Sequence, residues 1–109
     1  RNVIYIDDAV DALILAASSN DANGKVFFAA GDKHYSVMNI AKETVKCIGL
    51  GKVVFAEWSP ERRATEIGDA VISNQEIKSI LGWSPKYDLK TGLVKTKIYY
   101  QTCLEKYLR

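Results

Sequence analysis

One segment that is apolar on nearly every side constrains this chain most. Residues 9–17 read AVDALILAA, and Asp7 or Asp8 precedes them as a helix N-cap. Asp11 falls in the first turn, where the helix dipole favours an acid. A helix of this kind is normally buried on more than one side. Because a single domain of 109 residues could hardly cover it, we expect a further domain to pack there.

Short runs of branched, aromatic and other apolar residues predict β-strands, and capped periodic segments predict further helices. The strands are expected at 3–6, 25–30, 52–57 and 70–72, with 25–30 buried on both faces. The further helices are expected from Ser36 to Gly49, from a capping box at 73–76 to Gly82, and from Asp88 along a core-packing stripe to Tyr107. The expected fold class is therefore α/β, a small mixed α/β unit of short strands with about four helices.

Two adjacent arginines, Arg62 and Arg63, are expected in the connection 62–69, outside any periodic segment. A guanidinium group presents a planar fork of donors that suits phosphate or carboxylate, and a loop position lets it meet a ligand. Gly68 is expected to let the chain turn back, and Asp69 to anchor that turn. The alternative is a solvated surface pair that makes ion pairs only with neighbouring glutamates. The residues alone leave both interpretations open.

Charge and composition narrow the classes of partner. The chain has 15 basic and 13 acidic residues, so no broad positive field indicates a nucleic-acid partner. No apolar run reaches the roughly 18 residues of a membrane span, and no signal peptide is visible. Cys47 and Cys103 lie far apart without metal-ligand spacing, which indicates a reducing, cytoplasmic compartment. The single histidine, His34, is interpreted as a turn residue, so no metal site is expected.

Four stretches in their order resemble the C-terminal part of the extended short-chain dehydrogenase/reductases, the nucleoside-diphosphate-sugar epimerases and dehydratases such as UDP-glucose 4-epimerase. The stretches are 1–8 (RNVIYIDD), 25–31 (KVFFAAG), 66–77 (EIGDAVISNQEI) and 81–96 (LGWSPKYDLKTGLVKT). Together they span most of the chain. Three residues depart from the family pattern, namely Ala29, Asn74 and Glu76.

The resemblance implies an N-terminal Rossmann domain that binds NAD or NADP through a glycine-rich loop and carries a Tyr-x-x-x-Lys pair. This sequence has neither, because no tyrosine is followed four positions later by lysine, and Gly49-Leu50-Gly51 lacks a third glycine. We therefore expect no catalytic and no cofactor-binding residue here. The first residue is Arg1 rather than methionine, and we interpret 1–109 as the C-terminal substrate-binding portion of a longer protein, with its NAD-binding domain absent.

The resemblance further implies a nucleoside-diphosphate sugar as ligand and a homodimer as assembly. Family arginines that neutralise the pyrophosphate match Arg1 and either Arg62 or Arg63 in this sequence. The implied function is the nucleotide-sugar-binding part of an NAD(P)-dependent epimerase or 4,6-dehydratase, without activity as this piece alone. The three departures from the pattern favour an alternative, a non-catalytic sensor or assembly module that kept the scaffold and lost the chemistry.

Overall fold

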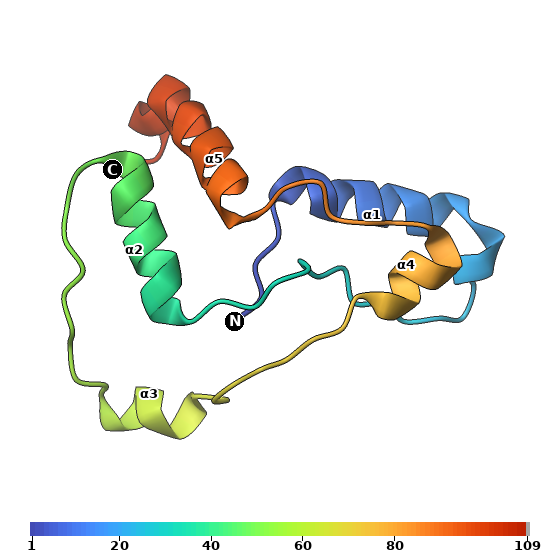
Figure 1. Cartoon of the computed structure of the whole chain (residues 1–109), viewed down its shortest axis with the longest axis horizontal. Coiled ribbons are helices and arrows are strands. Elements are labelled where there is room, and N and C mark those ends of the chain that lie inside the picture. The colour runs from blue at the N-terminus through green and yellow to red at the C-terminus, as the bar shows by residue number, and fades with distance from the viewer. Residues whose placement is uncertain (109) are drawn as a thin grey trace.

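The computed structural model describes residues 1–108, and these residues are helical with long connections (Figure 1). The elements in chain order are α1 (Ile6–Ser18), the 3₁₀ helix η1 (Asn20–Ala22), α2 (Val37–Ile48), α3 (Pro60–Thr65), α4 (Gln75–Leu81), α5 (Leu89–Cys103) and the 3₁₀ helix η2 (Leu104–Lys106). The radius of gyration is 16.8 Å, above the roughly 13 Å of a compact domain of about this length. The chain is therefore less compact than a typical domain of its length.

The predicted strands are wrong for the part of the chain that the structure describes. Its only β-pairing is an isolated antiparallel bridge between Asn2 and His34. Branched and aromatic residues favour an extended backbone, but a strand also needs a neighbour that supplies ladder hydrogen bonds. Runs 3–6 and 25–30 pack against the same core, and Ile72 of run 70–72 bonds to His34, but within residues 1–108 no ladder hydrogen bonds join one run to another. Only the connection that contains 52–57 lies apart, at the outer edge of the molecule (Figure 1). The prediction of a mixed α/β fold is thus confirmed for the helices and wrong for the strands.

The expected burial of 25–30 on both faces is also wrong. Val26 and Phe28 are 81% and 62% exposed, whereas Phe27 and Ala29 pack against the core. Alternate side chains therefore point inward and outward, as along a strand with one covered face. The other face of this segment is bare.

A small core lies where α1 meets α4 and the segment that follows it. Ala12, Ile77 and Trp83 are buried there, and partly buried neighbours pack around them: Ile4, Leu15, Phe27, Ala29 and Leu81. The opposite face of α1 remains exposed, with Leu13 at 71% and Ile14 at 62%. A covering domain for this face stays a prediction.

The predicted helix ends are confirmed where the capping residue bonds to its own helix. Ser36 accepts a 3.1 Å hydrogen bond from the Asn39 N–H at the start of α2, and Gly49 ends that helix with a φ of +83°. Asp88 accepts from the Thr91 N–H at 2.9 Å and so caps α5.

Two predicted caps are wrong. Helix α1 begins at Ile6 after Tyr5, which makes no side-chain cap, and places Asp7 and Asp8 inside the first turn. Helix α4 begins after Asn74, again without a side-chain cap, so the capping box does not form. Asp8 and Asn74 contact distant segments instead, and Ser73 accepts from the Gln75 N–H at 3.2 Å rather than from the Glu76 N–H that a capping box requires.

The predicted stripe along the last helix is correct except at its two tyrosines, and Cys103 between them is half-buried. Leu89, Leu93 and Thr96 are half-buried on α5, which packs against α2. Tyr100 and Tyr107 are 40% and 54% exposed, so the core-packing role predicted for them is wrong. They stack edge-to-face on each other with ring centroids 5.1 Å apart, in place of a core contact.

Within residues 1–108, no helix is both long enough and apolar enough to cross a membrane. The same residues contain no group of three or more potential metal ligands.

Candidate functional site

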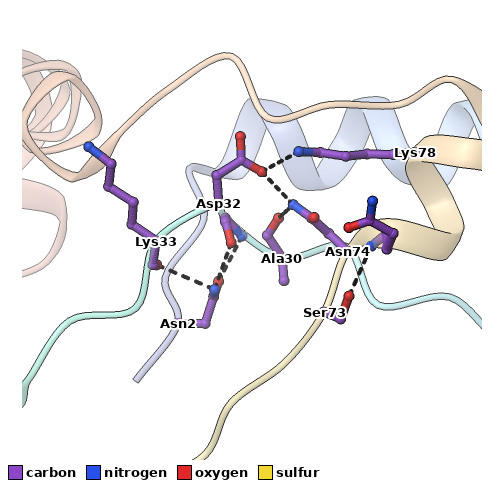
Figure 2. Close-up of polar contacts among 9 residues, drawn as sticks. Asn2, Ala30, Asp32, Lys33, Ser73, Asn74 and Lys78 are labelled. Atoms are coloured by element: carbon purple, nitrogen blue, oxygen red, sulfur yellow. Dashed lines mark hydrogen bonds and ion pairs between the residues drawn. The ribbon is translucent and has the colours of Figure 1, made fainter.

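Arg1 is held in place by main-chain pairing between the first residues and 34–35. The Arg1 amino group donates to the Tyr35 carbonyl at 2.6 Å, and the Tyr35 N–H donates back to the Arg1 carbonyl at 2.8 Å. Asn2 extends this junction, because its side chain exchanges hydrogen bonds of 2.8 and 2.7 Å with the main chain of Gly31 (Figure 2). The guanidinium of Arg1 therefore projects from a fixed backbone.

That guanidinium meets the turn at 66–68. Nη1 of Arg1 donates to the Gly68 carbonyl at 2.5 Å, and Nη2 forms an ion pair with the Glu66 carboxylate. The two side chains are 32% and 25% exposed, so the pair is only partly solvated. Gly68 has a φ of +69°, which confirms the predicted turn at this glycine. Asp69 makes no side-chain hydrogen bond with any of residues 1–108, so its predicted anchoring role is wrong, and Arg1 holds the turn instead.

The adjacent arginines lie in a helix, which corrects the predicted connection. Helix α3 starts after Ser59, whose hydroxyl accepts from the Arg62 N–H at 3.3 Å, and Pro60 occupies its first position. The Ser-Pro pair was the sequence signal for this helix, and the sequence interpretation missed it.

The two guanidinium groups have different surroundings. The Arg62 guanidinium lies 5.6 Å from the centre of the Trp58 ring, a cation–π arrangement. Arg63 lines a cavity of about 530 Å³ with Glu57, Trp58, Pro60 and Ala64. No hydrogen bond or ion pair among residues 1–108 joins either arginine to Arg1. The structure therefore brings Arg1 to the Gly-Asp turn and leaves the arginine pair on a separate exposed helix.

His34 contributes a contact that the sequence did not indicate. Its Nε2 accepts a hydrogen bond of 2.9 Å from the Ile72 N–H, which ties the segment after Gly68 to the turn that carries Tyr35. His34 was predicted as a turn residue, but it forms the bridge to Asn2 directly after the bend at 32–33, and it is also a tether for 66–72. Glu66 was likewise missed as the partner of Arg1, because no local pattern links residues 65 positions apart.

A polar network fixes the far end of the same segment (Figure 2). Asn74 donates to the Ala30 carbonyl and to the Asp32 carboxylate, both at 2.7 Å, and Lys78 donates to that carboxylate at 2.6 Å. The hydrogen bond from Lys78, followed by that from Asn74, holds the pKa of Asp32 below its ordinary value. The network joins the start of α4 to the loop after residue 30.

A second set of polar contacts joins α1 to the segment at 86–87. The Asp8 carboxylate is fully buried and accepts from the N–H groups of Lys86 and Tyr87 at 2.9 and 3.1 Å. The Lys86 ammonium reaches Asp11 at 2.5 Å, and this hydrogen bond raises the Lys86 pKa. The residues that directly follow the Gly-Trp-Ser-Pro stretch therefore bind to α1.

No protein-family model matches the chain. UDP-glucose 4-epimerase of Lacticaseibacillus casei is 29% identical over 101 residues, which cover 88% of this chain and 29% of that enzyme. UDP-glucose 4-epimerase of Corynebacterium glutamicum is 32% identical over 93 residues, which cover 84% of this chain and 27% of that enzyme. The chain thus spans less than a third of the length of these relatives.

A solved structure shares the fold. The Bordetella bronchiseptica enzyme WbmF, crystallised with NAD⁺ and UDP, superposes with a TM-score of 0.76 over 97% of this chain and 31% of its own, at 24% identity. The helical arrangement with its long connections is therefore a known fold. Sequence and fold together relate the chain to the C-terminal part of the extended short-chain dehydrogenase/reductases, the family of the nucleotide-sugar epimerases and dehydratases.

Proposed function

We propose that residues 1–109 form the nucleotide-sugar-binding portion of an NAD(P)-dependent nucleoside-diphosphate-sugar epimerase or 4,6-dehydratase of the cytoplasm. The observation that carries the proposal is the meeting of Arg1 with the turn at Gly68. Through the Arg1 guanidinium, this contact connects 1–8 with 66–77, two of the four stretches that resemble the family. The named relatives, two UDP-glucose 4-epimerases and a UDP-bound enzyme, support this class of ligand.

The physical basis is the cost of taking a diphosphate out of water. Its charges lose their hydration when they enter a site, and forked guanidinium donors replace that hydration with short, charge-assisted bonds. In the proposed site Arg1 supplies one fork from a fixed backbone. Arg62 or Arg63 supplies a second from α3, whose residues are all exposed and therefore accessible.

The residues of this chain do not themselves fit a dinucleotide cofactor. The only closely spaced glycines, Gly49 and Gly51, follow the C-terminus of α2, where free carbonyl groups carry partial negative charge. A pyrophosphate requires the opposite end of a helix, with its free N–H groups. We propose that NAD or NADP is bound by an N-terminal Rossmann domain, and that this domain covers the exposed face of α1. A homodimer is the proposed assembly.

One of the departures that favoured a non-catalytic module has a structural role. Asn74 donates to the Ala30 carbonyl, which an aspartate at this position could not do when ionised. An aspartate would also place a second carboxylate beside Asp32. Asn74 therefore gives no support to a loss of chemistry, and the enzyme portion remains the proposed function.

The test compares single variants of the intact protein by calorimetric titration with UDP. Arg1→Ala is expected to weaken binding about tenfold to a hundredfold, since a hydrogen bond to a charged group contributes roughly 1.5–3 kcal/mol. Either Arg62→Ala or Arg63→Ala is expected to show a loss of about tenfold or more. Lys25→Ala is the control, because this exposed lysine follows η1 and its side chain makes no hydrogen bond or ion pair with Arg1, Arg62 or Arg63. Parent-like affinity in all three arginine variants would refute the site.

A further inference from the structure

The guanidinium of Arg1 already holds two oxygen atoms of its own chain. One is the main-chain oxygen of Gly68, at 2.5 Å from Nη1, and the other belongs to the Glu66 carboxylate, which pairs with Nη2. A fork-shaped pair of donors facing two oxygens is the geometry in which arginine receives a phosphate or a carboxylate. Two of the five N–H donors of this guanidinium, one on each Nη atom, are therefore already engaged from within the protein, and its charge is paired with a carboxylate.

Glu66 has no other partner that would explain its position. Its carboxylate makes no hydrogen bond or ion pair within residues 1–108 except with Arg1. It follows the last residue of α3 with an extended backbone and so belongs to the turn rather than to a helix. Because the pair is only about a quarter to a third exposed, solvent screens it less than a surface ion pair.

The segment that carries Glu66 is able to move without breaking a core. All residues of α3 are exposed, and this helix lies apart from the others at the edge of the molecule (Figure 1). Gly68 adopts positive φ two residues after Glu66, at a position where no other heavy atom outside its neighbours would touch an added Cβ. Withdrawal of the carboxylate would therefore expose few apolar side chains to water.

We propose that Glu66 is an internal competitor for the anion-binding guanidinium of Arg1, so that a bound diphosphate must displace its carboxylate. This inference rests on the proposed function, because it takes the diphosphate as the ligand of Arg1. The competing carboxylate lowers the affinity for the anion, and its departure couples ligand binding to movement of 66–68 and α3. Glu66 is thus an affinity-determining residue rather than a ligand contact.

If Glu66 supported ligand binding instead of competing with it, its replacement would change the affinity in the opposite direction. A glutamate that only orients Arg1 for its ligand would support binding, and its loss would weaken affinity. A competing glutamate lowers affinity, and its loss strengthens binding. The sign of the change therefore separates the two roles.

The experiment titrates UDP into the intact protein, comparing the parent with Glu66→Gln and Glu66→Ala. Both variants are expected to bind UDP about tenfold more tightly, because ligand binding no longer breaks a charge-assisted pair. Glu61→Gln is the matched control, since it removes the same charge from exposed α3 without a hydrogen bond or ion pair to Arg1. It is expected to bind as the parent does, within about twofold. The double variant Arg1→Ala/Glu66→Gln should show no gain over Arg1→Ala.

Equal or weaker UDP binding in both Glu66 variants, with the parent still binding UDP, overturns the competitor role alone. A gain of the same size in Glu61→Gln also overturns it, because general charge would then explain the effect. Absence of UDP binding in the parent and in every variant overturns the proposed function together with this inference. Circular dichroism of each variant confirms that the compared proteins are folded.

Discussion

The indole nitrogen of Trp83 donates a hydrogen bond of 3.1 Å to the main-chain oxygen of Asp8, 75 residues earlier in the chain. The side chain of Asp8 is at the same time fully buried and accepts from two N–H groups that follow Trp83. Helix α1 and the Gly-Trp-Ser-Pro stretch are therefore joined at one residue by both its backbone and its carboxylate. This double contact joins 1–8 to 81–96, the first and last of the four stretches that resemble the family.

Removal of the Asp8 carboxylate should destabilise the fold. Asp8→Ala leaves the part-buried N–H groups of Lys86 and Tyr87 without their carboxylate partner, and we expect a loss of about 2–4 kcal/mol in the free energy of unfolding. Asp7→Ala is the control, because Asp7 is exposed and only approaches Lys95 at 3.8 Å. Its cost should stay below about 1 kcal/mol. Urea unfolding measures both, and equal losses in the two variants would contradict the anchoring role of Asp8.

Two glycines with different packing should respond in opposite ways to alanine. A Cβ at Gly31 would lie 2.7 Å from the Val3 carbonyl oxygen, so Gly31→Ala should cost about 1–3 kcal/mol. A Cβ at Gly92 would meet only the Tyr5 ring at 3.5 Å, an ordinary contact. Because Gly92 lies in α5, its replacement by alanine should be neutral or stabilise by up to about 1 kcal/mol. Thermal unfolding of the two variants tests the contrast, which similar shifts in Tm would exclude.

The Asp32–Lys78 pair predicts a specific dependence of stability on pH. The lowered pKa of Asp32 means that its ionised form is favoured in the folded state, chiefly by the Lys78 hydrogen bond. The contribution is therefore present above the ordinary value of 3.8 and is lost as the pH falls through the lower folded pKa. Lys78→Met should cost about 0–1 kcal/mol at neutral pH, since both side chains are partly solvated. Unfolding curves recorded from pH 7 to pH 2 should converge at the acidic end, and a constant difference would argue against this linkage.

The bare face of α1 should make the 109-residue chain associate with itself. Leu13 and Ile14 are 71% and 62% exposed on adjacent positions, and apolar patches of several hundred Å² are seldom left uncovered. The double variant Leu13→Lys/Ile14→Lys is expected to shift the chain toward monomer in sedimentation velocity at high concentration. A parent chain that stays monomeric and binds no hydrophobic dye would contradict this expectation.

The sequence predicted the parts of the fold that short-range chemistry determines. Ser36 and Gly49 bound α2 because a hydroxyl cap and a left-handed glycine act within a few residues. The strands failed because Val26 and Val71 indicate an extended backbone but carry no information on a pairing partner. Asp8 failed as a cap because its carboxylate binds N–H groups at positions 86 and 87, a contact that no local pattern encodes.

The sequence predicted some residues of the candidate site, but it did not predict which of them contact one another. Arg1 was singled out by the family resemblance, and its contact with Gly68 joins two stretches that the sequence could not place relative to each other. Only the alternative interpretation, a solvated arginine pair, gave Glu66 a partner, namely a neighbouring arginine. In the fold Glu66 pairs with Arg1 instead. The pairing of residues 1–2 with 34–35 fixes the backbone of Arg1 and so places its side chain near Glu66. The roles of Arg62 and Arg63 stay predictions.

The central claim is that this portion of the protein binds the diphosphate of a nucleotide through Arg1. Calorimetric titration of the intact protein with UDP and with uridine, in the parent and in Arg1→Ala, tests it most directly, because the two ligands differ only in the diphosphate. We expect the parent to bind UDP at least about tenfold more tightly than uridine, and Arg1→Ala to lose most of this preference. Equal affinity of the parent for UDP and uridine, or an undiminished preference in Arg1→Ala, would contradict it.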